Sequence, residues 1–519
     1  MPRWLGLACI ATAAFLGCAA VGFGIQIREP DKHDEFSYLL AADTFLRGRL
    51  ANPTPPAWQH FETFHVLLEP SYASKYPPAQ GAALALGRWL SGHAIVGVWL
   101  SSAFACAAIA WLLLAWLPRP WAWAGAWLAL VSFSIAGWWS QTYWGGSLAA
   151  GAGALVYGAL RRLVEAPRAR DGAWLGVGLA LLAVSRPFEG AVASLPPALV
   201  LAACLVRRAP AARLVLARAL APTAAAVALA LAFLGYYDHR VTGHALRPPY
   251  VEHSEQYLMV PLFSFGSPVE PPAWRHAVLA ELHHDFDLSW YAKQRTAGER
   301  LAHAVWKAQP SYQFYLGPPG LLALLGLALV RWDRWLGLAL ASCALVLFAT
   351  LFVSTFGGRP HYLAPVAGLI VLLLGEGLRR WSQVRPTGLA IGWVVVAVVV
   401  AMVTLRLAVR LERHAQPDAF WSRQRASLVR DLERRPGRDL VLVRYGPGHN
   451  VHEEWVYNGA DLASQEVLFA RSMDAAADHA LLDAYPGRQV WCLDVGSGGA
   501  RITPGPVAPA GGRAAACAP

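Results

Sequence analysis

Eleven apolar runs, nearly free of charged side chains, recur along this chain and constrain its fold more than any other feature. They lie at 4–25, 93–117, 121–138, 143–160, 172–185, 188–206, 219–237, 313–330, 335–355, 361–378 and 387–405. A run of about 20 apolar residues is long enough to cross the hydrocarbon of a bilayer as a helix. Only 15% of the 519 residues are charged, against about a quarter in soluble domains. The sequence therefore predicts an all-α polytopic membrane protein with about eleven transmembrane helices and excludes a soluble globular fold.

Arginine clusters between the runs predict how the chain is oriented. They fall at 119, 161–170, 207–218, 331–334 and 379–385. Because cytoplasmic loops are enriched in Lys and Arg, we expect these clusters and the N-terminus to face the cytoplasm. Two large loops, at about 26–92 and 238–312, and the C-terminal part then lie outside. The net charge of +11 is explained by these clusters and indicates no nucleic-acid partner.

The stretch 172–206 is too long for one spanning helix and short for two. Arginine clusters flank it on both sides, so we expect a hairpin that turns at 185–190 and returns to the same face. Arg186 and Glu189 in this turn then lie near or below headgroup depth. Charges persist there only when they are paired or face a wet cavity.

The chain after residue 410 is expected to form a small α/β extracytoplasmic domain at 411–502. Strand-like runs lie at 439–444, 466–470 and 489–494, and a helical stretch lies at 474–484. Residues 503–519 are rich in Pro, Gly and Ala, which is typical of disorder. Two alternatives are open for Cys492 and Cys517: a disulfide between them, or two free thiols. The disulfide is expected only if this part of the chain is extracytoplasmic.

Two short motifs in the first large loop carry residues suited to chemistry. Asp34 and Glu35 follow the first span, at the start of an amphipathic stretch at 36–50. An acidic pair suits any solvated helix start, but a fixed carboxylate can also serve as a general base. Lys75 precedes Tyr76-Pro77-Pro78, a rigid turn into the next helix. An ammonium at this place can bind a phosphate or anchor the loop at the membrane surface.

Together with Arg359-Pro360-His361-Tyr362, these motifs resemble the C-type (GT-C) superfamily of membrane glycosyltransferases that use lipid-phosphate sugars. Within it, the bacterial aminoarabinose transferase and protein O-mannosyltransferase branch is the most similar. The resemblance covers the order of elements over about 1–410. It implies a GT-C-like module there and an inverting transfer from a polyprenyl-phosphate sugar to a glycan, lipid or protein acceptor. The expected location is the bacterial inner membrane, with a cytoplasmic N-terminus and a periplasmic C-terminal domain.

The resemblance also implies roles for single residues. Asp34 is expected to be the general base, and Glu35 to orient the acceptor or bind a cation. The expected contacts to the donor phosphate are Lys75, Arg359, His361 and Arg186, and the other expected substrate contacts are Tyr76, Glu62, Glu189 and Tyr362. No metal ligand set and no cofactor is predicted, although a divalent cation stays open.

The chain departs from the family pattern at two places. Tyr76 separates Lys75 from the two prolines, and the segment 138–146 lacks the acid that many members carry at the end of a later helix. Glu62 or Glu189 would have to take the place of that acid.

Two other readings of the sequence remain open. A transporter or flippase would line a path with Arg186, Glu189 and Glu376, but the chain shows no internal repeat. A non-catalytic scaffold would bind a cell-envelope partner through its C-terminal domain. The segment 283–287 contains metal-ligand residue types but lacks a partner cluster and is only a weak metal candidate, and the similar segment 449–454 is interpreted as a polar loop. Nothing in the sequence indicates an oligomeric state.

Overall fold

The computed structural model describes residues 2–329, 333–354, 358–385, 390–505 and 517. Within the described residues, each of the eleven apolar runs forms helix. They form α1 (Arg3–Gly24), α4 (Ile95–Trp116), α5 (Arg119–Ala129) with a π-helical extension (Leu130–Ser134), α6 (Ser147–Glu165), α7 (Ala169–Ser185), α8 (Pro187–Arg207), α9 (Pro210–Thr242), α14 (Gly317–Leu325), α15 (Arg334–Leu351), α16 (Ala367–Trp381) after the 3-10 segment η6 (Pro360–Val366), and α17 (Ile391–Ala415).

Eight helical stretches within the described ranges are long and apolar enough to cross a membrane. The three remaining predicted runs, α5, α6 and α7, are shorter or less apolar and complete the bundle. α6 is rich in Gly and Ala, and its residues are buried almost throughout the first four turns. Small residues allow helix backbones to approach closely in a bilayer. A Cβ on Gly153 would lie 1.8 Å from the carbonyl oxygen of Pro365, so only glycine fits this crossing.

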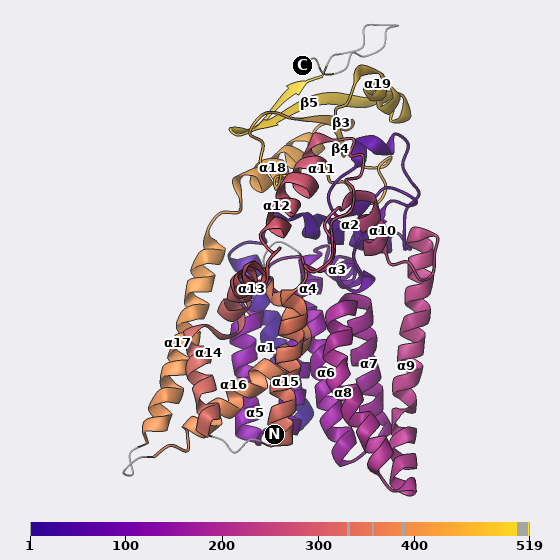
Figure 1. Cartoon of the computed structure of the whole chain (residues 1–519). Coiled ribbons are helices and arrows are strands. Elements are labelled where there is room, and N and C mark those ends of the chain that lie inside the picture. The colour runs from indigo at the N-terminus through magenta and orange to yellow at the C-terminus, as the bar shows by residue number, and fades with distance from the viewer. Residues whose placement is uncertain (1, 330–332, 355–357, 386–389, 506–516, 518–519) are drawn as a thin grey trace.

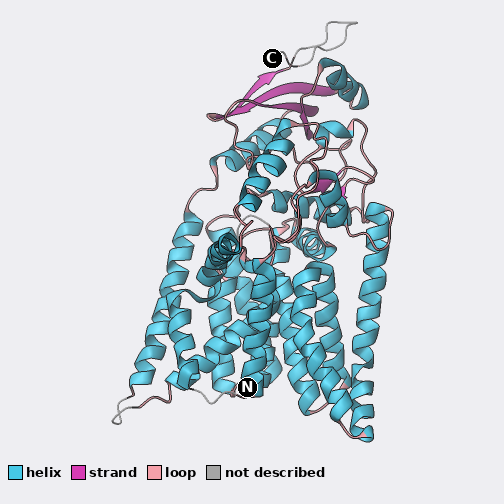
Figure 2. Ribbon diagram, viewed as in Figure 1, coloured by secondary structure: helices cyan, strands magenta, loops and turns pink. Residues whose placement is uncertain are grey.

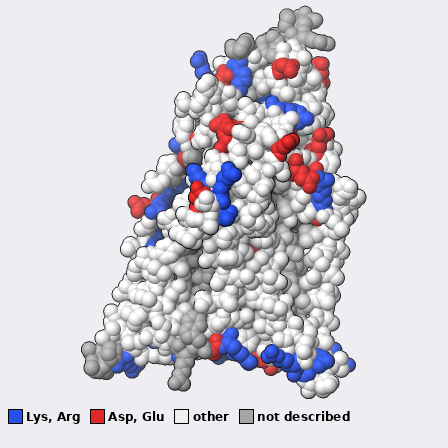
Figure 3. Space-filling model, viewed as in Figure 1, with Lys and Arg blue, Asp and Glu red and all other residues white. Residues whose placement is uncertain are grey.

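The helices stand side by side, with the N-terminus at one end of the bundle and the strands and C-terminus at the other (Figures 1 and 2). Figure 3 shows a wide band on this face almost without Lys, Arg, Asp or Glu, and Lys and Arg gathered at the N-terminal end of the bundle. An apolar band of this kind is what a bundle in hydrocarbon presents. The prediction of a polytopic helical membrane protein is confirmed.

The hairpin in the stretch 172–206 is tighter than its predicted turn at 185–190. Arg186 alone separates α7 from α8. Pro187 at the first position of α8 lets the new helix begin at once, because a proline there loses no helical hydrogen bond.

Both large loops fold above the bundle. The first contains α2 (His33–Leu46), η1 (Trp58–Phe61), β1 (Val66–Leu67), β2 (Ala73–Ser74) and α3 (Pro78–Ser91). The second contains α10 (Pro249–Tyr257), α11 (Ala277–Ala280), the π-helical segment η3 (Glu281–Phe286), α12 (Asp287–Ala292) and α13 (Ala297–Ser311). Figure 1 shows α13 nearly end-on, lying across the top of the bundle. The amphipathic stretch expected at 36–50 corresponds to α2.

The C-terminal part forms the predicted small α/β domain. It contains α18 (Phe420–Glu433), β3 (Arg438–Tyr445), β4 (Val467–Arg471), α19 (Ala475–Ala484), β5 (Arg488–Gly496) and β6 (Gly499–Pro504). The sheet order is β4-β3-β5-β6, with β3 parallel to β4 and β5, and β6 antiparallel to β5. The sequence missed α18 and β6.

The expected disorder at 503–519 is wrong for its first two residues. Thr503 and Pro504 belong to β6 and pair with Cys492 and Trp491. Cys492 also forms a disulfide with Cys517. The rest of this segment lies almost wholly outside the described residues, as does Arg331 of the predicted arginine clusters.

The C-terminal domain packs onto the first loop instead of standing apart. Phe36, Phe61 and Tyr72 share one hydrophobic core with Trp421 and Phe469 of the domain. Nε of Arg471 donates to the backbone carbonyl of Glu62 over 2.7 Å. The domain therefore holds the loop that carries both sequence motifs.

Candidate active site

Asp34 lies in the first turn of α2 and faces Tyr76. The hydroxyl of Tyr76 donates a hydrogen bond to Oδ1 of Asp34. The Tyr76 ring is stacked on Tyr38, one turn further along α2, at 4.5 Å between centroids. Pro77 and Pro78 then begin α3 and fix the direction of the chain at Tyr76. The residue that departs from the family pattern thus orients the candidate base.

Glu35 turns away from Asp34 and holds backbone instead. Its Oε2 accepts from the N–H groups of Asp31 at 3.0 Å and Lys32 at 3.2 Å, and its Oε1 accepts from the N–H of Tyr143 at 2.9 Å. The side chain is 3% exposed. Burial raises the pKa of Glu35 to about 7, Asp31 adds to this, and the N–H donors oppose it. Glu35 therefore joins α2 to the segment 138–146.

Lys75 supplies a half-buried cation near Asp34. Burial lowers the pKa of its ammonium to about 8, while Asp34 and Asp287 oppose the decrease. Nζ lies 5.4 Å from the centroid of the Tyr76 ring. Within the described part of the chain, Nζ makes no hydrogen bond and no ion pair, so it is free to bind an anion.

Arg186 and Glu189 meet at the junction of α7 and α8, with Nη1 3.8 Å from Oε1. Cζ of Arg186 lies 5.8 Å from the centroid of the Tyr362 ring. Burial raises the pKa of Tyr38, Arg186 opposes this, and Asp34, Glu189 and Tyr362 add to it. These four side chains therefore lie near enough to Tyr38 to act on its charge. The two charges predicted in the turn, Arg186 and Glu189, are paired.

Arg359 and His361 rest on the aromatic segment 138–146. Cζ of Arg359 is 5.1 Å from the ring centroid of Trp144 and 5.7 Å from that of Trp138. The His361 ring lies 5.2 Å from Trp144 and 4.7 Å from Tyr362. The segment that lacks the family's acid instead offers aromatic faces, which attract guanidinium groups.

Glu62 differs from the expectation that it takes the place of the missing acid. It is buried, and its Oε1 accepts from the Tyr257 hydroxyl at 3.1 Å and from Arg275 at 3.2 Å. These contacts tie the first loop to the second, and the described contacts of Glu62 include neither Asp34 nor Lys75.

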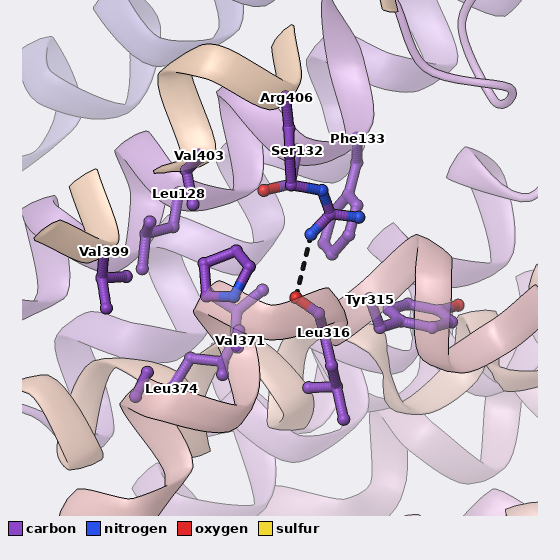
Figure 4. A pocket seen from close by; sticks show the side chains of 13 residues that line it. Leu128, Ser132, Phe133, Tyr315, Leu316, Val371, Leu374, Val399, Val403 and Arg406 are labelled. Atoms are coloured by element: carbon purple, nitrogen blue, oxygen red, sulfur yellow. Dashed lines mark hydrogen bonds between the residues drawn. The ribbon is translucent and has the colours of Figure 1, made fainter. Parts of the chain in front are cut away.

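A pocket inside the bundle lies apart from these residues. Figure 4 shows its apolar walls, which include Leu128, Val371 and Val399, and Nη1 of Arg406 donating to the Leu316 carbonyl over 2.9 Å. None of the predicted site residues lines it.

The structure thus brings together Asp34, Lys75 and Tyr76 on one side and Arg186, Glu189, Arg359, His361 and Tyr362 on the other, linked through Tyr38. Sequence reasoning missed Tyr38, Trp138 and Trp144. Aromatic side chains are common at the outer ends of spans in membrane proteins. The residue type alone therefore did not mark these three residues as part of a site.

No protein-family model and no curated protein matches the sequence. Solved structures do match. One is the archaeal oligosaccharyltransferase AglB from Archaeoglobus fulgidus in complex with an inhibitory peptide and a dolichol-phosphate, at 11% identity and a TM-score of 0.50, over 94% of this chain and 69% of that chain. A structure of the Archaeoglobus fulgidus oligosaccharyltransferase tethered with an acceptor peptide matches at 12% identity and a TM-score of 0.48, over 88% and 63%.

ArnT from Cupriavidus metallidurans bound to undecaprenyl phosphate matches at 13% identity and a TM-score of 0.49, over 95% of this chain and 92% of that chain. The chain spans only about two thirds of the archaeal oligosaccharyltransferase chains. At such identities, likeness in structure concerns the fold alone. The match to AglB shows that this chain shares the overall fold of that oligosaccharyltransferase.

Proposed function

We propose that this protein transfers a sugar from a polyprenyl-phosphate donor to a cell-envelope acceptor at the outer face of the bacterial inner membrane. The observation that carries the proposal is the arrangement around Asp34. A carboxylate oriented by Tyr76 lies beside the unpaired ammonium of Lys75, on a fold shared with AglB. A base and a cation placed together suit the transfer of a group from a phosphate.

In the proposed reaction, Asp34 accepts the proton of an acceptor hydroxyl or amine. The freed lone pair attacks the anomeric carbon of the sugar, and the bond from this carbon to the phosphate oxygen breaks. The polyprenyl phosphate leaves with the bonding electrons. A single displacement of this kind inverts the anomeric configuration.

The negative charge that develops on the leaving phosphate needs nearby cations. We assign this role to Lys75, Arg359 and Arg186, with His361 as a further hydrogen-bond partner. Arg359 is held on the faces of Trp138 and Trp144, and among the described residues its guanidinium has no hydrogen-bond partner, so its donors can serve the phosphate. Preorganised charges of this kind stabilise a transition state without later reorganisation.

A divalent cation shared by Asp34 and Glu35 does not fit these residues. Both Glu35 oxygens already accept backbone N–H groups, and a hard cation prefers several free oxygens. The described residues hold no group of three or more His, Cys, Asp or Glu side chains that could bind a metal ion. No proposed step is routed through a metal.

Binding of undecaprenyl phosphate to the purified full-length protein in nanodiscs tests the proposal first. The wild type and Asp34→Asn should bind this lipid equally, whereas Arg359→Lys should bind it more weakly. Transfer is then measured with a panel of undecaprenyl-phosphate sugars. A protein that binds no polyprenyl phosphate, or that carries the lipid across a bilayer without transferring sugar, would contradict the proposal in favour of a scaffold or a flippase.

A further inference from the structure

Four imidazoles cluster beside Lys75 and take no part in the proposed transfer. They are His33 at the start of α2, His65 in the first loop, His253 in α10 and His283 in η3, and we call them the imidazole cluster. Centroids of neighbouring rings are 5.8 Å apart for His33 and His65, 6.1 Å for His65 and His253, and 6.4 Å for His253 and His283. Residues far apart in the sequence thus form one polar site.

Five ring nitrogens of this cluster are buried without a hydrogen-bond partner among the described residues. They are Nε2 of His33, Nδ1 of His65, both nitrogens of His253 and Nε2 of His283. His253 is 1% exposed and His283 is 2% exposed. Buried polar atoms without partners are rare in folded proteins. Five of them at one place indicate a site for a ligand with several polar atoms.

The charges around the cluster indicate which kind of ligand fits. Burial, and after it the ammonium of Lys75, holds the pKa of His65 and His253 well below the usual value. The pKa of His33 is lowered by burial and then by His452 and Lys32. An anion would reverse these effects, because it favours protonated imidazoles and accepts their N–H groups.

The backbone at His65 supports a functional role for its ring. His65 adopts a left-handed conformation with φ 63°, which is uncommon for residues other than glycine. Its carbonyl accepts the Ser37 hydroxyl at 2.6 Å and the Lys75 N–H at 3.3 Å. These bonds hold the ring 5.9 Å from that of Tyr76.

We propose that the imidazole cluster, together with Lys75, binds an anionic group of the acceptor, either a phosphate or a carboxylate. His33 directly precedes Asp34, so an acceptor anchored here lies beside the candidate base. The exposed ring of His452 in the C-terminal domain is 5.9 Å from His33 and places the domain at the edge of this subsite. The assignment to the acceptor rests on the proposed transferase function, whereas anion binding does not.

Sulfate is a suitable probe, since its charge stays constant between pH 6 and pH 8. The full-length protein is placed in nanodiscs of neutral phosphatidylcholine, and its Tm is followed against sulfate concentration. Sulfate should raise the Tm more at pH 6 than at pH 8, because the bound anion favours protonated imidazoles. Two cluster rings already contact titratable side chains: Nδ1 of His283 lies 3.0 Å from Oδ2 of Asp287, and Nδ1 of His33 lies 2.9 Å from the Tyr457 hydroxyl. The other charged and titratable groups that face the cluster are Lys32, Lys75, His452, Tyr76 and Tyr257.

His253→Gln should weaken sulfate binding roughly tenfold or more, as expected for the loss of charge-assisted hydrogen bonds. It should leave the Tm without sulfate nearly unchanged, since the ring nitrogens have no partner to lose. His284→Gln is the matched control, because His284 is exposed and pairs with Asp285. His65→Asn is a second variant, since Asn tolerates the left-handed backbone.

Several outcomes would overturn the anion subsite. They are the absence of sulfate stabilisation at both pH values, equal losses in His253→Gln and His284→Gln, or stabilisation by Zn²⁺ but not by sulfate. Nanodiscs containing phosphatidylglycerol, without sulfate, reveal a lipid headgroup as the source of the anion if they reproduce the stabilisation. His253→Gln should also keep binding undecaprenyl phosphate. Sulfate binding without any binding of that lipid would refute the transferase but keep the subsite.

Discussion

Replacing each of the two adjacent carboxylates at the start of α2 should separate catalysis from stability. Asp34→Asn keeps the size of the side chain and an oxygen that accepts from the Tyr76 hydroxyl, so the fold and donor binding should persist. The variant loses the base, which should slow the transfer roughly a hundred- to ten-thousand-fold. This loss corresponds to about 2.7 to 5.4 kcal/mol of transition-state free energy.

Glu35→Gln should show the opposite pattern. Two carboxylate oxygens of Glu35 accept three backbone N–H groups, whereas glutamine offers one oxygen and one NH₂ group. At least one partly buried N–H then loses its acceptor, at a cost of about 1 kcal/mol. The Tm should fall, and the transfer rate of the folded fraction should fall less than in Asp34→Asn.

Single-turnover transfer in nanodiscs at pH 8, with the Tm of each variant, measures both effects. This pH is above the pKa of Glu35, which is about 7, so Glu35 is largely ionised in the wild type. Wild-type rates in Asp34→Asn would refute the assignment of the base. A larger rate loss in well-folded Glu35→Gln than in Asp34→Asn would assign the role of the base to Glu35.

Four further predictions follow from the same contacts. Arg359→Lys should lose affinity for undecaprenyl phosphate although the charge is kept, because a lysine cannot fork onto two phosphate oxygens; equal Kd values would remove Arg359 from the phosphate site. Lys75→Arg should preserve this affinity at pH 9, where the wild type weakens because the Lys75 ammonium, with its pKa of about 8, loses its proton; parallel pH profiles would contradict this. Arg471→Met should lower the free energy of unfolding by roughly 3 to 5 kcal/mol, since it leaves the buried carboxylate of Glu454, 2.5 Å away, without the cation that balances its charge, and the exposed Arg438→Met is the control in a thermal melt. Reporter fusions in both large loops and in the C-terminal domain should mark one face of the membrane, opposite to the N-terminus, and a split result would overturn the predicted orientation.

The sequence alone predicted the helices of the bundle and three strands of the C-terminal sheet. Both depend on local patterns: a long apolar run satisfies its own backbone in lipid only as a helix, and short β-branched runs between turns favour strands. The alternation of arginine clusters also predicted the hairpin, whose turn depends on Arg186 and Pro187. These features need no information about distant residues.

The candidate site was predicted only in part from the sequence. Motif order singled out Asp34, Lys75, Arg359 and Arg186, but adjacent carboxylates are indistinguishable until their partners are known. The separate environments of Asp34 and Glu35 arise because Tyr76 and the backbone of Tyr143 approach from other elements. Glu62 was misjudged for the same reason, since its partners Tyr257 and Arg275 lie about 200 residues further along the chain.

The imidazole cluster and the packing of the C-terminal domain were decided by tertiary structure alone. Three of the imidazoles lie in α2, α10 and η3, His65 lies in the turn before β1, and no spacing in the sequence relates the four. The pattern of strands in the sequence indicates a separate C-terminal domain. In the structure, however, Phe469 joins the hydrophobic core of the first loop, and Arg471 donates a hydrogen bond to it. Such contacts depend on which surfaces meet after the helices are packed. Local sequence patterns do not encode this, because they reflect the backbone hydrogen bonds within each segment and not its distant neighbours.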